Sequence, residues 1–359
     1  MIHIKDHKQT DIFDPWSYMS PKRRDMLSRS WAGLFKEHLL CELPVNKLAP
    51  FFDEAFGRPT KELHTVLGVL ILQENFDFTD EEAVSQLAFN IQWHYALNIP
   101  EESDAAKYIC PKTLWNIRSI IVDNNLDAIL FEAITDKLAL VFNVDTSNQR
   151  IDSVHIKSNM RRLGRIGIFA KSIRKFLINL KRGNKKLFNT IEQSALDRYL
   201  PKKALSCFSM VKPSESSKTL ALAANDLFDL VQQFKKFPQI TSMHSYKLME
   251  RVLKEQCNLK TSDGKHTVIV KEPKKISSDS LQNPSDPDAT YSSHKGQGYQ
   301  VQVMETYTKA EGINAKPKTL NLITHVEVEK ACQSDAQALL PAIESTQKRG
   351  LGPEELEAD

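Results

Sequence analysis

Residues 149–186 read QRIDSVHIKSNMRRLGRIGIFAKSIRKFLINLKRGNKK, and this stretch decides how the rest of the chain is interpreted. It begins with an alternating pattern over residues 150–156, which predicts a β-strand carrying one carboxylate, Asp152. Apolar residues then recur at three- and four-residue steps over residues 166–180, which predicts a helix. The stretch therefore leads from a strand with a single acidic side chain into a helical segment.

The helical segment is strongly basic. From Lys157 to Lys186 there are eleven Lys or Arg and no Asp or Glu, although the net charge of the whole chain is +3. The solvent-exposed face of a helix normally carries both positive and negative side chains. A surface with positive side chains only favours contacts with phosphate groups, which position DNA without reading its sequence. A scaffold that binds acidic proteins is the alternative. The DNA-binding residues that we expect are Arg161, Arg162, Arg165, Lys171, Arg174, Lys175, Lys181 and Arg182.

Asp152 has two interpretations. Acidic residues are disfavoured in the middle of a strand, so it is either a solvent-facing side chain of an edge strand or a metal ligand. Hard cations such as Mg²⁺ take carboxylate oxygens and bridge phosphate groups. Its position beside a basic segment favours the metal ligand.

Composition limits the class of protein. A chain of 359 residues with 41% hydrophobic and 26% charged residues is expected to form two or three globular domains. The five cysteines lack paired spacing, which argues against a disulfide framework or a cysteine-based zinc module and fits a reducing cytosol. We find no secretory signal and no apolar run long enough to cross a bilayer, and we expect a cytoplasmic protein.

Residues 1–18 are expected to form an irregular leader, and residues 19–145 an all-helical domain. Thr60 is the predicted N-cap of one helix. Thr79 and Glu82 form a predicted capping box.

A further helix is predicted to begin at Pro111. It contains Lys112, Trp115 and Asn116, which could belong to a DNA-recognition helix. Trp115, however, has the spacing of a core residue, so we expect it to be buried.

Strand periodicity returns at residues 298–307 and 320–328, where a hairpin or antiparallel pair is predicted. A helix over residues 334–349 and a strand from residue 354 onwards follow. With an insertion of about residues 160–290 set aside, a small mixed sheet with a crossover helix remains. The predicted fold class is an all-helical N-terminal domain followed by an α/β domain, residues 146–359, with a mostly helical insertion.

Several segments together resemble bacterial insertion-sequence transposases of the DDE type. FDPWSYMSPKRRDMLSRSWAGLFKEHLL, GRPTKELHTVLGVLILQ, TDEEAVSQLAFNIQWHYAL and CPKTLWNIR resemble their helical N-terminal domain. RIDSVHIKSNMRRLGRIGIFAK resembles the segment with the first catalytic Asp, and DPDATYSSHKGQGYQVQV the return into the catalytic core. The resemblance covers nearly the whole chain and implies that residues 146–359 form a partial ribonuclease-H-like domain.

The resemblance implies a metal-dependent enzyme that cuts and joins double-stranded DNA at transposon ends and in target DNA, as a homo-oligomer on DNA. Asp152 matches the first catalytic carboxylate, and Asp359 matches the second; both would bind Mg²⁺ or Mn²⁺. The third carboxylate of the family, a Glu on a later helix, has no counterpart in the 359 residues. We therefore expect an incomplete chain without catalysis. The alternatives are a non-catalytic DNA-binding inhibitor and a decayed remnant.

Overall fold

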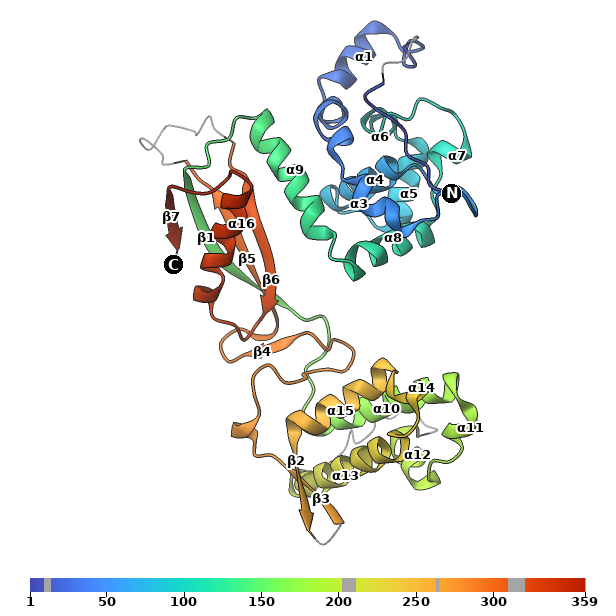
Figure 1. Cartoon of the computed structure of the whole chain (residues 1–359), viewed down its shortest axis with the longest axis vertical. Helices are drawn as coiled ribbons and strands as arrows, with labels where there is room; N and C mark the ends of the chain where they lie inside the picture. Colours follow the sequence, from blue (N-terminus) through green and yellow to red (C-terminus); the bar gives the residue numbers. More distant parts are fainter. Residues whose placement is uncertain (10–13, 202–210, 263–264, 309–319, 359) are drawn as a thin grey trace. The chain divides into compact units, whose positions relative to one another are not determined.

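The computed structural model describes residues 1–9, 14–201, 211–262, 265–308 and 320–358 (Figure 1). The chain forms two compact units, each assembled from separate stretches of sequence. Unit 1 contains Met1–Asp152, Val303–Val326 and Leu340–Asp359, and unit 2 contains Ser153–Gln302 and Glu327–Leu339.

The first part of unit 1 is helical, as predicted. Short π- and 3₁₀-helical turns connect several of its helices. The α-helices are α1 (Pro21–Ser28), α2 (Trp31–Leu34), α3 (Val45–Leu48), α4 (Leu63–Asn75), α5 (Asp80–Phe89), α6 (Ile91–Ala96), α7 (Asp104–Lys107), α8 (Pro111–Asp123) and α9 (Asp127–Val141).

Local sequence signals set two of these helix starts. The capping box at α5 is confirmed, because the Thr79 and Glu82 side chains each accept a hydrogen bond from the other residue's backbone N–H. Pro111 is the first residue of α8, also as predicted. The prediction for Thr60 is wrong, since α4 begins three residues later and its N-cap is Glu62.

The reason for this difference lies at the amino terminus. The Thr60 hydroxyl accepts a hydrogen bond from the His3 backbone N–H at 2.9 Å, so Thr60 binds residues 1–9 instead of capping the helix. The Leu63 N–H donates to the His3 carbonyl at 3.1 Å, and Ile2 packs against the core of the helical domain. The predicted leader thus begins with residues that pack on this domain.

One mixed sheet contains five strands: β1 (Asn148–Lys157), β4 (Thr290–Ser292), β5 (Gly296–Thr306), β6 (Ile323–Lys330) and β7 (Glu355–Ala358). The order is β4-β5-β1-β7, and β6 also pairs with β5. Strands β1 and β7 are parallel. Strands β1 and β5 run in opposite directions, because Tyr307 bonds to Asn148 while Ser158 bonds to Gln297.

Helix α16 (Leu339–Lys348) precedes β7, as the crossover pattern predicted, and begins later than residue 334 because Asp335–Gln337 is a 3₁₀ turn. Gly350 ends this segment with a φ of +75°, which suits a glycine after a helix. The coarse prediction of a mixed α/β protein is therefore confirmed.

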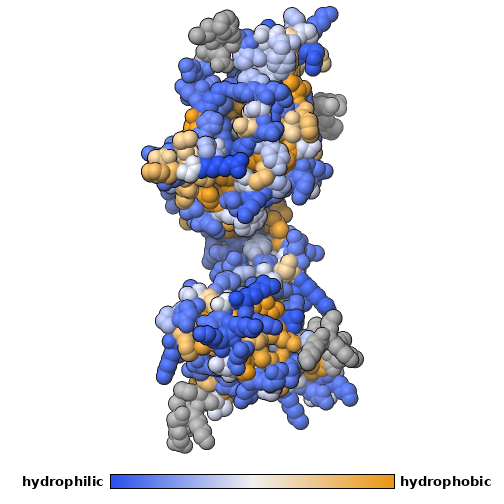
Figure 2. Space-filling view, turned by 90° about the vertical axis from the view of Figure 1, so that its right-hand side faces the viewer, coloured by the Kyte–Doolittle hydropathy of each residue, from blue (hydrophilic) through white to orange (hydrophobic). Residues whose placement is uncertain are grey.

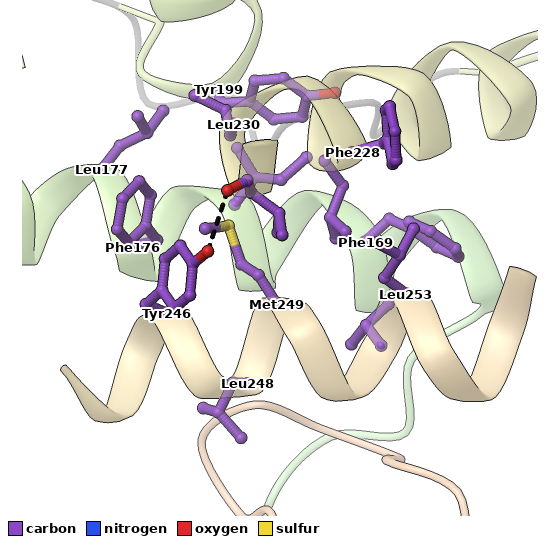
Figure 3. Close-up of a cluster of buried hydrophobic side chains, with 14 of the residues drawn as sticks. Phe169, Phe176, Leu177, Tyr199, Phe228, Leu230, Tyr246, Leu248, Met249 and Leu253 are labelled. Carbon is purple, nitrogen blue, oxygen red and sulfur yellow. Dashed lines mark hydrogen bonds between the residues drawn. The ribbon is translucent and has the colours of Figure 1, made fainter. Parts of the chain in front are cut away.

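The insertion between β1 and β4 forms a helical bundle in unit 2 (Figure 1). Its buried core residues all lie between Ile168 and Leu281, so the insertion supplies its own core. Figure 3 shows this core, with the Tyr246 hydroxyl donating to the Val231 carbonyl at 2.9 Å. The helices are α10 (Arg165–Gly183), α11 (Lys185–Phe188), α12 (Gln193–Tyr199), α13 (Ser216–Phe234), α14 (Pro238–Thr241) and α15 (His244–Gln256).

An antiparallel hairpin follows α15, formed by β2 (Cys257–Ser262) and β3 (Lys265–Val270). The sequence did not predict it. Figure 2 shows that hydrophilic residues cover most of the face in view, with smaller hydrophobic areas between them. In the described part of the chain, none of the helices has both the length and the apolar character needed to cross a bilayer.

Candidate nucleic-acid interface and carboxylate site

Asp152 lies on the exposed face of β1. The alternation of the strand places Gln149 and Ile151 in the interior, whereas Arg150 and Asp152 are exposed. Gln149 fixes the buried side, because its amide nitrogen donates to the carbonyl of Leu351 at 2.6 Å. The predicted strand is therefore confirmed, and its carboxylate is exposed.

A basic residue lies beside Asp152. The Arg150 Nε and Nη2 atoms both donate to Glu305 Oε1, at 2.8 and 2.6 Å. This hydrogen bond raises the pKa of Arg150, and the nearby charges of Glu305, Glu357 and Asp152 raise it further. The guanidinium thus offsets part of the negative charge on this side of the sheet.

Strand β7 pairs with β1 next to Arg150 and Asp152. Arg150 pairs with Glu357, and Ile151 pairs with Ala358. Asp359, the predicted second metal ligand, lies outside the described residues. Asp152 offers the hard carboxylate oxygen that Mg²⁺ or Mn²⁺ prefers, so the donor fits such an ion, and the described residues supply one ligand of the predicted pair.

The basic segment divides into two groups of side chains. The first group is exposed along α10 and the turn before it, and comprises Arg161, Arg162, Lys171, Arg174, Lys181 and Arg182. Within the described ranges, none of these cations forms an ion pair with Asp or Glu. Arg162 lies over the ring of Tyr291, 5.0 Å from its centroid, and Lys181 lies 5.7 Å from that of Phe188.

The second group uses its charged atoms inside the fold. Arg165 Nε donates to Gln256 Oε1 at 3.1 Å, and Lys175 Nζ donates to the Pro284 carbonyl at 2.5 Å. Burial lowers the pKa of both Arg165 and Lys175. Arg174 is exposed but also donates to the Tyr199 carbonyl, at 2.9 Å. The cations best placed for an external phosphate are therefore the remaining ones.

Helix α8 exposes a second polar face. Lys112, Trp115 and Asn116 are exposed, while Leu114 and Ile117 are buried. The expectation that Trp115 is buried is wrong, because its side chain is 61% exposed. The sequence of α8 places apolar residues on two faces of the helix, and the face that contains Leu114 packs into the core. Trp115 instead joins the two polar residues on the outer face.

Sequence reasoning missed the role of Arg150 and Glu305. The alternating pattern of both strands would have placed each on an outward face, but their pairing depends on the β1–β5 register across an insertion. It also missed the cluster of His7, Glu62 and His64. The two-residue spacing of Glu62 and His64 can be seen in the sequence, but no nearby residue indicates that His7 contacts them.

Comparison with protein families, curated proteins and solved structures found no match for this chain.

Proposed function

We propose that this chain acts in DNA transposition as a DDE-type protein with a ribonuclease-H-like core. The observation that carries the proposal is the exposed, one-signed basic face of α10, which follows directly after the strand that bears Asp152. Phosphate groups are the partner that such a face suits best. Its proposed ligand is double-stranded DNA, both transposon ends and target, bound by a homo-oligomer.

The sheet supports the ribonuclease-H-like part of the proposal. With the insertion set aside, β6, β5 and β1 lie next to one another, and β7 joins parallel to β1 after α16. The order of elements in the sequence predicted such a small mixed sheet with a crossover helix, and the resemblance implies that it belongs to a ribonuclease-H-like core. Asp152 occupies the exposed face of its central strand.

Each of the two proposed metal ligands comes directly after a residue that is paired across β1 and β7. Ile151 and Ala358 are Cα partners across β1 and β7, and the residues that follow them in the chain are Asp152 and Asp359. A bound Mg²⁺ or Mn²⁺ would polarise a phosphodiester and lower the pKa of a water molecule. The role of Asp152 is to hold that ion, and the role of the α10 cations is to hold the DNA backbone.

A non-catalytic DNA-binding protein is the second candidate, and Arg150 favours it. Its guanidinium donates a hydrogen bond to Glu305 and places a positive charge near Asp152. A cation at this position competes with a divalent ion for the carboxylate. Such a protein would bind transposon ends without cutting them.

The α10 face is tested by DNA binding as a function of salt. Replacing Lys171, Lys181 and Arg182 with Gln should lower the affinity for a duplex and reduce the salt slope by roughly 2–3, since each phosphate contact contributes about 0.9. The matched control replaces Lys235, Lys236 and Lys247, which are also exposed in unit 2. An equal loss in the control, or binding without salt dependence, would contradict the proposal.

Cleavage separates the two candidates. A supercoiled plasmid that carries transposon ends is incubated with the chain and Mg²⁺ or Mn²⁺. Metal-dependent nicking that the Asp152→Asn variant loses, with DNA affinity unchanged, supports the transposase. Binding without nicking by either protein supports the non-catalytic candidate.

A further inference from the structure

Three side chains of types that can bind a metal ion meet in the helical domain: Glu62 and His64, two positions apart, and His7 from the amino-terminal segment. His64 Nδ1 lies 2.9 Å from Glu62 Oε1, and His7 Nε2 lies 3.5 Å from Glu62 Oε2. Of the residues that the structure describes, His7, Glu62 and His64 are the one set of three His, Cys, Asp or Glu whose ligand atoms all lie within 4.8 Å of one another.

The backbone fixes the carboxylate of Glu62. As the N-cap of α4, Glu62 accepts hydrogen bonds from the N–H groups of His64 and Thr65, at 3.1 and 2.7 Å. The Lys5 N–H also donates to it, at 3.3 Å. These backbone donors therefore hold the carboxylate in one orientation.

His7 directs its Nε2 atom into the cluster, while its Nδ1 atom lies 3.4 Å from the side-chain amide nitrogen of Asn98. Its side chain is 3% exposed, and in the described structure its buried Nε2 atom makes no hydrogen bond, since the approach to Glu62 does not meet hydrogen-bond geometry. Its ring meets that of His64 edge to face, with centroids 4.9 Å apart. A buried polar atom without a partner costs free energy, and a metal ion would satisfy it.

The surroundings leave room for a further ligand. His7 and Glu62 line a cavity of about 430 Å³. The ammonium groups around it already have oxygen partners, because Lys5 pairs with Glu101 at 3.5 Å and Lys61 donates to the carbonyls of Asp104 and Ala105. The cavity can supply a water molecule as a fourth ligand.

We propose that His7 Nε2, His64 Nδ1 and the Glu62 carboxylate bind a divalent transition-metal ion, with Zn²⁺ as the commonest match to two imidazoles, one carboxylate and a water. The ion connects the amino-terminal segment to the first turn of α4. Backbone donors to Glu62 act as outer partners that orient the ligand. The site is separate from Asp152 and independent of the DNA proposal.

The test titrates Zn²⁺ into the chelator-treated, full-length chain against a chromophoric chelator. We expect one high-affinity ion whose binding weakens at least about 100-fold in His7→Gln, since even outer partners contribute 10–100-fold. His3→Gln is the matched control, because His3 lines the same cavity without joining the cluster, and it should bind as the parent does.

A second measurement keeps the test valid if His7→Gln does not fold. Co²⁺ added to the parent chain should give the visible bands of a four-coordinate nitrogen and oxygen site, without thiolate charge transfer. Failure of the parent to bind a stoichiometric ion, a thiolate band, or undiminished binding by folded His7→Gln would each overturn the proposal.

Discussion

Arg198 donates from Nε and Nη2 to the two carboxylate oxygens of Asp226, at 2.9 and 2.8 Å. The hydroxyl of Tyr199, a fully buried residue, donates to the same carboxylate at 2.7 Å. The contacts join α12 to α13 within the bundle. Burial, followed by the hydrogen bond to Asp226, raises the pKa of Tyr199 well above its usual value, which keeps this hydroxyl a donor.

Replacing Asp226 with Ala should lower the free energy of unfolding of the bundle by about 2–4 kcal/mol. The change leaves the Tyr199 hydroxyl without its acceptor and the Arg198 guanidinium without its charge partner. Urea unfolding followed by circular dichroism measures the effect. Asp197→Ala is the control, since this exposed carboxylate on α12, the helix of Arg198, should change stability by less than about 0.5 kcal/mol. Similar values for both variants would contradict the role of Asp226.

The buried thiol of Cys257 predicts a loss of stability at high pH. Burial raises the pKa of Cys257 from its usual 9.0 to about 11. Between these values the unfolded chain has lost a proton that the folded chain keeps, so the free energy of unfolding falls as pH rises, by roughly 2–3 kcal/mol from this group. Urea unfolding between pH 8.5 and 11 should show a shallower fall in Cys257→Ala. Cys110→Ala is the contrasting control: its bond to Thr113 lowers the pKa of this thiol, so its ionisation adds stability as pH rises, and the variant should not show a shallower fall.

The exposed face of α8 predicts a role in reading DNA. Asn116→Ala and Trp115→Ala should each reduce the preference for transposon ends over random duplex, by roughly 5- to 100-fold for one lost base contact. Competition binding at fixed salt measures this preference. Neither change should affect stability, because both side chains are exposed. Val122→Ala on the same helix, at a position 68% exposed, is the control. Unchanged specificity in both variants would remove α8 from the interface.

Arg150 predicts a change in metal affinity. Arg150→Gln removes the positive charge beside Asp152 and should raise the affinity for Mn²⁺ roughly two- to fivefold, the range for exposed charges in water. Titration followed by electron paramagnetic resonance of free Mn²⁺ measures it. Combining this change with Asp152→Asn should abolish the gain. A gain that persists in the double variant would place the ion elsewhere.

Local chemistry explains which parts of the fold the sequence predicted. The Thr79–Glu82 capping box and Pro111 act within one turn, so their structural consequences can be predicted from neighbouring residues alone. The alternation over residues 150–156 likewise predicted a strand, and β1 covers these residues.

The remaining features depend on contacts between distant residues. Glu62 is the N-cap in place of Thr60, because the Thr60 hydroxyl accepts a hydrogen bond from the backbone N–H of His3, 57 positions away. Trp115 lies outside the core because the rest of the domain selects the opposite stripe of α8. Arg165 has the sequence character of a surface cation, yet it reaches Gln256, 91 positions away.

The continuous core of the bundle has a consequence for how this chain can be altered. Its buried apolar residues come from one uninterrupted stretch between Ile168 and Leu281, so they need no partner from the flanking sequence. A segment with its own core can be moved between hosts as a module. The whole bundle, with its cationic face, can therefore be replaced by another domain or inserted into another protein, while the flanking strands keep their pairing.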